Sequence, residues 1–178
     1  MSMKEERVIL VDESDRETGT MEKLRAHQQG VLHRAFSVCI FNDSGELLLH
    51  KRAEGKYHSP GLWTNTCCSH PRPGETTREA ALRRLQEEMG FTCAIEPSFE
   101  FIYRAELDQG LTEHEYDHVF TGIWNGTPAP SADEVADWEY RSTSDILAEM
   151  QMHPERFTAW FRILLPRLIE TGIHAQRA

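Results

Sequence analysis

Residues 69–91 have the sequence SHPRPGETTREAALRRLQEEMGF, and this stretch decides the fold. Thr76 and Glu79 have the spacing of a capping box, which predicts the start of a helix, and Gly90 marks its end. One face of this helix is expected to be buried, because four apolar side chains recur at helical spacing. They are Ala81, Leu82, Leu85 and Met89.

Charged side chains of the same helix fall off this apolar stripe, so they face a site or solvent. Arg83 and Glu87 are spaced i to i+4, as are Arg84 and Glu88. One interpretation is therefore a solvated face held by salt bridges. The residues that precede the helix favour a functional interpretation instead.

The whole stretch resembles the Nudix box, a loop–helix–loop whose glutamates hold divalent metals against a diphosphate. The residues that match G-x5-E-x7-R-E-U-x-E-E-x-G-U are Glu75, Arg83, Glu87, Glu88, Gly90 and Phe91. Two positions depart from the motif, because Ser69 replaces the first glycine and Arg84 replaces a glutamate. A guanidinium matches phosphate oxygens, so the box is predicted to bind a diphosphate rather than to split it.

Immediately upstream, residues 63–71 have the sequence WTNTCCSHP and place the Cys68 thiol two residues from the His70 imidazole. A thiol and an imidazole, with carboxylates further along the chain, indicate a metal site with an acid/base group beside it. The neighbouring Cys67 has two interpretations, a second reactive thiol or an inert buried one.

Imidazoles and carboxylates outside this stretch extend the candidate metal site. His27 and His33 precede it, and Glu113 and Glu115 follow it. On a strand, two residues two apart face the same side, so both carboxylates can share an ion. With His70 they offer an N/O donor set that suits Zn²⁺, Mn²⁺ or Fe²⁺.

The remaining chain predicts strands and short helices in one domain. Strands are expected at Arg7–Val11, 35–41, 46–51, 99–107, 115–124 and Val135–Arg141, and further helices at 144–150 and 154–170. The turn 42–45, Asn-Asp-Ser-Gly, predicts a hairpin between the second and third strands, and 56–60 and 68–74 are expected to be loops. We expect an α+β fold, a mixed β-sheet flanked by helices, as a single domain over residues 1–178.

Composition excludes several classes of protein. With 39% hydrophobic and 27% charged residues, the 178-residue chain fits a soluble globular domain. A net charge of −10 argues against a nucleic-acid or anionic-membrane surface, and no signal peptide or membrane span is predicted. The four cysteines form no C-x-x-C pair, so free thiols and a cytoplasmic location are expected.

From about Glu6 to Trp160 the chain resembles the type I isopentenyl-diphosphate isomerases. The landmarks are TGTMEK at 18–23, LHRAFS at 32–37, KRA at 51–53, YRA at 103–105, the Glu113–Glu115 pair and above all W-T-N-x-x-C-x-H-P. The resemblance implies an α/β/α Nudix-like fold with a core at about 31–165 and an N-terminal extension at 1–30. It also implies interconversion of isopentenyl and dimethylallyl diphosphate in isoprenoid biosynthesis.

The same resemblance implies roles for individual residues. Cys68 and Glu115 match the catalytic cysteine and glutamate, Tyr103 a tyrosine that contacts the glutamate, and Trp160 an aromatic facing a cationic centre. For Tyr103 and Trp160, ordinary packing is the alternative.

Further matches imply how ligands are held. The diphosphate is expected to contact Lys23, Arg52, Lys56, Ser69 and Arg84. Mg²⁺ bound with the diphosphate is expected to contact Glu88 and the backbone carbonyl of Cys68. The implied ligands of the second metal, Mn²⁺ or Zn²⁺, are His27, His33, His70, Glu113 and Glu115.

Three functions remain to be compared. The first is the isomerase, which acts on a small allylic or homoallylic diphosphate as a monomer or small homo-oligomer, without nucleic acid or membrane. The second is a Nudix-type diphosphohydrolase, against which Arg84 counts. The third is a non-catalytic domain with a structural metal, against which the widely spaced, carboxylate-rich donors count.

Overall fold

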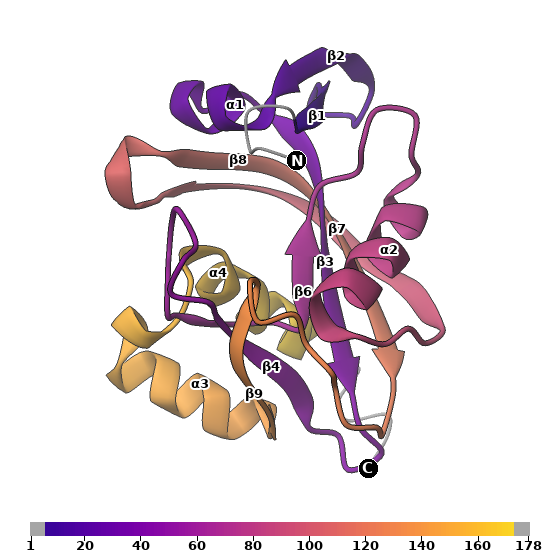
Figure 1. The fold of residues 1–178 in the computed structure, drawn as a ribbon, viewed down its shortest axis with the longest axis vertical. Coiled ribbons are helices and arrows are strands. Elements are labelled where there is room, and N and C mark those ends of the chain that lie inside the picture. The colour runs from indigo at the N-terminus through magenta and orange to yellow at the C-terminus, as the bar shows by residue number, and fades with distance from the viewer. Residues whose placement is uncertain (1–5, 173–178) are drawn as a thin grey trace.

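The computed structural model describes residues 6–172 as a mixed β-sheet with helices on both sides (Figure 1). The strands are β1 Arg7–Val11, β2 Glu17–Glu22, β3 His33–Phe41, β4 Leu47–Arg52, β5 Trp63–Thr64, β6 Cys67–Ser69, β7 Ile95–Glu106, β8 Thr112–Ile123 and β9 Val135–Arg141. The helices are α1 Lys23–Gln29, α2 Thr77–Met89, α3 Thr143–Met152 and α4 Ala159–Glu170, with 3-10 turns η1 Asp108–Gly110 and η2 Pro154–Arg156. The predicted α+β fold is confirmed.

Strand β3 lies at the centre of the sheet. It pairs with β8 in parallel and with β6 antiparallel, and β8 pairs with β7 on its far side. A second antiparallel group, β9–β4–β5, meets β3 at the single pair Phe41↔Leu47. The strands that carry the predicted cysteine and carboxylates, β6 and β8, therefore both pair directly with β3.

Both faces of β3 are buried, because side chains alternate along a strand. Phe36, Val38 and Ile40 pack into a cluster under α2, whereas Cys39 and Phe41 pack into a cluster under α4. A strand that is buried on both faces needs apolar residues at successive positions, and residues 35–41 follow this pattern. The sheet is thus the middle layer between α2 and the α3/α4 pair.

Helix α2 begins and ends as its sequence predicts. The Thr76 hydroxyl accepts from the Glu79 amide at 3.2 Å, and the Glu79 carboxylate accepts from the Thr76 amide at 2.9 Å. Gly90 ends the helix at φ 75°, where a Cβ would lie 2.1 Å from the Ala129 carbonyl oxygen. Of the predicted apolar stripe, Leu82 is only partly buried and the others are fully buried.

The predicted hairpin between residues 35–41 and 46–51 is wrong beyond its turn. Gly45 donates to the Asn42 carbonyl at 3.0 Å, but β3 and β4 separate after one pair. The Thr66 side chain lies between them, accepting from the Ile40 amide at 2.9 Å and donating to the Leu48 carbonyl at 2.6 Å. A side chain from a later segment thus replaces the next rung of the ladder.

Other boundaries also differ from the predictions. Residues 68–74 are not all loop, because β6 includes Cys67–Ser69 and hydrogen-bonds to β3. The predicted helix 154–170 is broken, since Thr158 is extended and its hydroxyl caps α4 by accepting from the Phe161 amide at 3.3 Å. Strands β2 and β5 and helix α1 were not predicted, because segments of two to seven residues carry little periodicity.

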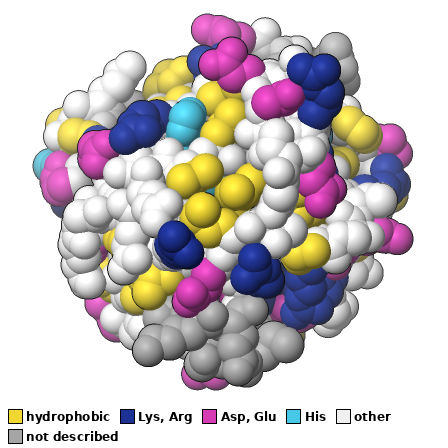
Figure 2. All heavy atoms as spheres, turned by 90° about the horizontal axis from the view of Figure 1, so that it is seen from above, with side chains coloured by type: hydrophobic (Ala, Val, Ile, Leu, Met, Phe, Trp, Pro, Cys, Tyr) yellow, Lys and Arg dark blue, Asp and Glu magenta, His cyan; other side chains and the backbone are white. Residues whose placement is uncertain are grey.

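The surface mixes both signs of charge. On the face seen in Figure 2, which is the β1/β2/α1 end of the molecule, cationic and anionic side chains surround a central group of hydrophobic ones. Within residues 6–172, no helix has the length and apolar character that a membrane span requires.

Candidate active site

Two adjoining cavities lie at the centre of the molecule. We call them the inner pocket, of about 60 Å³, and the outer chamber, of about 410 Å³. Every side chain predicted for the site lines the inner pocket except His33, which is fully buried. The residues that line both cavities are Lys23, Lys56, Tyr57, Ser69, His70 and Arg84.

Four of the predicted metal ligands form a cluster. His27, His33, His70 and Glu115 each offer a ligand atom, and these atoms lie within 4.8 Å of one another. The His70 Nε2 atom is 2.9 Å from Glu115 Oε1 and 3.2 Å from His33 Nε2. Two imidazole nitrogens that face each other at this distance need a proton or a metal ion between them.

Backbone carbonyls set the orientation of two of these imidazoles. His27 Nδ1 donates to the Lys23 carbonyl at 2.8 Å, and His33 Nδ1 donates to the Val31 carbonyl at 2.8 Å. Since a carbonyl oxygen only accepts, each Nε2 is left with its lone pair. Neutral imidazoles held in this way are the usual protein ligands of divalent metals, so the cluster can hold such an ion.

Burial keeps the imidazoles of His27 and His70 neutral. Desolvation lowers the pKa of His70 to about 3, although the Glu115 carboxylate raises it. Desolvation also lowers the pKa of His27, against the same carboxylate. Because a metal binds only the neutral ring, the site stays competent for metal below the ordinary histidine range.

Glu113 lies beside this cluster and is not one of its four members. The register of β7 and β8 sets Tyr103 opposite Glu115, and the Tyr103 hydroxyl lies 2.5 Å from Glu113 Oε1 and 2.7 Å from Glu115 Oε2. Burial and the Glu115 charge raise the pKa of Glu113. Burial alone would raise that of Glu115 as well, but His70 and His33 hold it well below its usual value. The two carboxyl groups therefore differ in proton affinity, as acid/base pairs do.

The two adjacent cysteines of β6 face opposite sides of the sheet. Cys67 is fully buried in the cluster under α2, whereas Cys68 faces the α4 side and lines the inner pocket. Desolvation, together with the Glu88 carboxylate, raises the pKa of the Cys68 thiol well above its ordinary value. Of these two thiols, only Cys68 lines the pocket, and it is protonated.

The polar residues before the cysteines are structural. Asn65 Nδ2 donates to the carbonyls of Val38 and Cys67, at 3.1 and 3.0 Å. Its Oδ1 atom lies 3.7 Å from Cys68 Sγ, so the same amide also orients the thiol. These hydrogen bonds give the Asn65 amide a structural role three residues before Cys68.

Trp160 reaches the inner pocket because the start of α4 is anchored to β5. The Thr158 amide donates to the Trp63 carbonyl at 3.0 Å, and the Thr158 and Thr64 hydroxyls are 3.0 Å apart. The Arg52 guanidinium lies 5.1 Å from the centre of the Trp160 ring. The indole of Trp160 can therefore interact with a cation in this pocket.

Three of the cations that line the outer chamber, Lys23, Lys56 and Arg84, have carboxylate partners. Lys23 pairs with Glu6 at 3.0 Å and Lys56 with Glu134 at 2.6 Å. Arg84 pairs with Glu87, Glu88 and Glu134, at 2.6, 2.5 and 3.3 Å. The i to i+4 ion pairs of α2 are thus real, and Arg84 also lines both cavities.

Sequence reasoning missed several residues that line the cavities. His58 is buried in the inner pocket, edge-on to Trp160 with ring centres 5.7 Å apart. Tyr57 lines both cavities, and Glu6 and Glu134 line the outer chamber. The loop 56–60 carries no periodicity, so only its proximity to the predicted Lys56 could have indicated His58 and Tyr57.

Comparisons with known proteins identify relatives over nearly the whole chain. The NUDIX domain family matches residues 31–161. An isopentenyl-diphosphate Delta-isomerase of Pectobacterium atrosepticum is 55% identical over 161 residues, 90% of each chain. Another of Burkholderia multivorans is 50% identical over 163 residues, 92% of this chain and 93% of that protein.

Solved structures show the same fold at low sequence identity. DR0079 from Deinococcus radiodurans has a TM-score of 0.78 at 20% identity, and the alignment covers 91% of this chain and 98% of that one. A MutT protein from Methanosarcina mazei has a TM-score of 0.64 at 24% identity, over 80% and 96% of the two chains.

Proposed function

The chain belongs to the NUDIX family and, within it, to the isopentenyl-diphosphate Delta-isomerases, and from this premise we propose how its own residues carry the reaction. The substrate pair is isopentenyl diphosphate and dimethylallyl diphosphate. The reaction moves one double bond, and Cys68 and Glu115 share the two proton transfers.

One observation carries this proposal. The Cys68 thiol and the Tyr103–Glu115 pair line one small pocket together with Trp160, although they come from four separate elements. Such a pocket contains two proton-bearing groups and an aromatic face, and the substrate itself excludes water. This is what protonation of an unactivated alkene requires.

The chemistry follows from the substrate. A proton is added to C4 and a C–H bond forms there, so the electron pair of the C3–C4 double bond is used and C3 becomes a tertiary cation. A base then removes a proton from C2, and that electron pair forms the C2–C3 double bond. No net charge or atom is gained, and the enzyme recovers its protons by exchange between the two groups and solvent.

The protonation states in the pocket suit this sequence. The Cys68 thiol is neutral, because desolvation and the Glu88 charge raise its pKa. The Tyr103 phenol is also neutral, because burial and the charges of Glu113 and Glu115 raise its pKa, and its one proton can be donated to either of the two carboxyl groups within reach. The Trp160 face stabilises positive charge at C3 by an amount on the order of 2 kcal/mol.

A divalent metal would be held by His27, His33, His70 and Glu115, with Glu113 beside them; we propose Mn²⁺ or Zn²⁺. When bound, it would lower the proton affinity of Glu115 and fix its orientation. His33 and His27 present their Nε2 atoms to the cluster because backbone carbonyls accept from Nδ1.

The diphosphate is proposed to lie where the two cavities meet. Lys23, Arg52, Lys56 and Arg84 supply positive charge there, and Ser69 supplies a hydroxyl. This local cluster explains how a chain of net charge −10 binds a multiply charged anion. Mg²⁺ bound with the diphosphate would be held by Glu88 and the Cys68 carbonyl.

Incubation of the purified protein with isopentenyl diphosphate, Mg²⁺ and Mn²⁺ in deuterated water tests the proposal. We expect dimethylallyl diphosphate with deuterium in the methyl group derived from C4, and exchange at C2. The hydrolase alternative predicts release of phosphate or pyrophosphate instead. Release of phosphate, or no product and no exchange, would refute the isomerase.

A further inference from the structure

The outer chamber contains carboxylates that none of the proposed roles uses. Glu6 Oε2 lies 3.0 Å from Lys23 Nζ, and Glu134 Oε2 lies 2.6 Å from Lys56 Nζ. The other oxygen of Glu134, Oε1, lies 3.3 Å from a terminal nitrogen of Arg84. One carboxylate thus bridges two cations from different elements, as the oxygens of a phosphate would.

The backbone fixes Glu134 in this bridging position. Its amide donates to the Ser131 carbonyl at 3.0 Å, and its carbonyl accepts from the Ala53 amide at 3.0 Å. The Ser131 amide in turn donates to the carbonyl of Glu88, at the end of α2. The backbone of Glu134 is therefore fixed between α2 and the loop after β4, and the carboxylate is held in turn by its contacts with Lys56 and Arg84.

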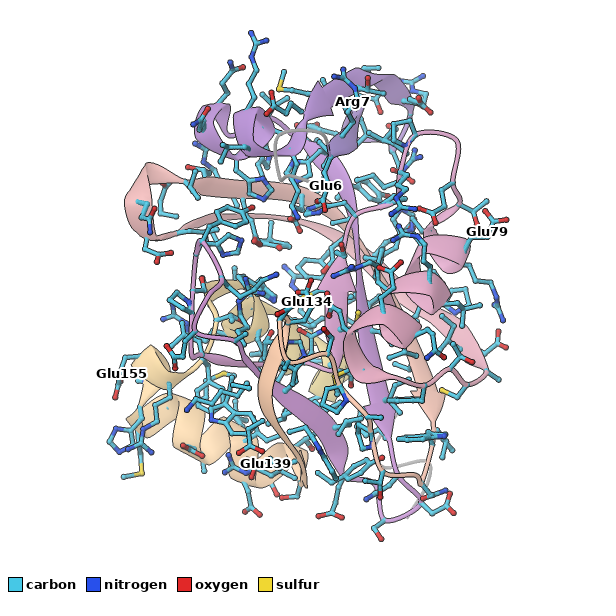
Figure 3. All side chains as sticks on the ribbon, viewed as in Figure 1. Glu6, Arg7, Glu79, Glu134, Glu139 and Glu155 are labelled. Carbon is cyan, nitrogen blue, oxygen red and sulfur yellow. The ribbon has the colours of Figure 1, made fainter. Side chains whose placement is uncertain are left out.

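Glu6 takes the corresponding position on the other side of the chamber. Figure 3 shows Glu6 and Glu134 on opposite sides of the central space, the first beside the start of β1 and the second at the start of β9. Burial alone would raise the pKa of each carboxyl group, but Lys23 lowers that of Glu6 and Lys56 lowers that of Glu134. Both groups are therefore ionised at neutral pH.

We propose that Glu6 and Glu134 are internal counter-ions that a diphosphate must displace from Lys23, Lys56 and Arg84, so that they set the affinity of the site for diphosphates. The inference rests on the proposed function, because it takes this chamber as the diphosphate site. Carboxylate and phosphate oxygens compete for the same N–H donors, and two anions beside one cation repel each other, so a bound diphosphate favours displacement of the carboxylates. Weaker binding of the diphosphate favours release of the product, which keeps the same diphosphate group.

The test measures binding of magnesium pyrophosphate by calorimetry to wild type, Glu134→Gln and Glu6→Gln. The amide of glutamine still accepts from Lys56, so the lysine stays in place while the competing charge is removed. Because each partly exposed ion pair accounts for up to about a factor of five, we expect Kd to fall about tenfold for Glu134→Gln, which removes two pairs. For Glu6→Gln, which removes one, we expect about threefold.

Two controls separate competition from structural effects. Glu139→Gln makes the same charge change on β9, and Figure 3 shows Glu139 near the bottom of the view, well below Glu134. This variant should leave Kd within about twofold. Glu134→Asp keeps the charge and should keep the affinity of the wild type. Thermal unfolding verifies that each variant is folded. If Glu134→Gln folds poorly, Glu6→Gln still tests the inference, because Glu6 lies in a separate segment of the chain.

Unchanged or weaker pyrophosphate binding by both glutamine variants overturns the inference, because a merely orienting carboxylate would give that result. Failure of the proposed function has a different signature. In that case the wild-type protein itself binds no pyrophosphate, and the diphosphate site and the inference are lost together.

Discussion

The inner pocket and the outer chamber hold their charged groups in different ways. At the inner pocket, His27 and the buried His33 behind it are fixed by backbone carbonyls, and the carboxyl groups share one tyrosine hydroxyl. In the outer chamber, Lys23, Lys56 and Arg84 are fixed by other side chains, and their partners are carboxylates on the chamber wall.

This difference corresponds to the two proposed roles, proton transfer in the inner pocket and diphosphate binding in the outer chamber. Groups that must stay in one protonation state are surrounded by protein, because a buried charge is set by its fixed neighbours. Groups that must exchange one anion for another are partly exposed, because ion pairs that solvent reaches are weak enough to be replaced. Changes in the inner pocket are therefore expected to act on kcat, and changes in the outer chamber on KM.

The largest effect is expected from Cys68→Ala. Removal of a general acid or base costs about 10²–10⁴ in rate, so kcat should fall about 10³-fold with little change in KM. The matched control is Cys67→Ala, on the opposite face of the sheet. It should leave kcat within about threefold and lower Tm by about 2–4 °C, since it costs about 1 kcal/mol of the free energy of unfolding. Equal losses of activity in the two variants would disprove the assignment of the thiol.

Trp160→Leu is expected to lower kcat about 30-fold, because the loss of about 2 kcal/mol of interaction with a cation raises the barrier by that amount. Phe161→Leu is the control, since Phe161 is fully buried on the same helix and does not line either cavity. Steady-state kinetics and thermal unfolding of both variants separate the two effects. A similar fall in kcat for Phe161→Leu would mean that Trp160 acts only by packing.

Lys56→Gln tests the outer chamber, as the two preceding variants test the inner pocket. Loss of one cation that contacts the diphosphate should raise KM about tenfold and leave kcat within about twofold. Lys51→Gln makes the same charge change on the neighbouring β4, outside both cavities, and should leave KM unchanged. A fall in kcat at constant KM for Lys56→Gln would instead place the lysine in the chemical step.

The smallest effect is expected from alkaline pH. The ordinary thiol pKa is 9.0, and desolvation and the Glu88 charge raise that of Cys68 well above it. A raised pKa means that the thiol keeps its proton as pH rises, so kcat at saturating substrate should vary less than about twofold between pH 7 and 10, where an unshifted thiol would lose about tenfold. A decline of kcat with an apparent pKa near 9.0 would show that the thiol is not desolvated in this way.

Much of the fold could be predicted locally. The capping box at Thr76, the glycine at 90 and the apolar spacing of α2 depend on residues at most four apart, so the sequence determines them directly. The long strands were predicted from their apolar runs. The predicted hairpin was wrong beyond its turn, because Thr66, 26 residues from Ile40, replaces the second rung between β3 and β4, and no local pattern carries that information.

The candidate site divides in the same way. The chain alone determined which residue types were available, the thiol beside an imidazole, the Glu113–Glu115 pair and an arginine in place of a metal-ligating glutamate. Only the tertiary structure decided that Cys68 faces the pocket while Cys67 does not, that Glu113 stands beside the four-residue cluster, and that Glu6 and Glu134 oppose the cations. The physical reason is that donor chemistry belongs to a side chain, whereas the direction in which it points depends on strand pairings and hydrogen bonds between distant segments.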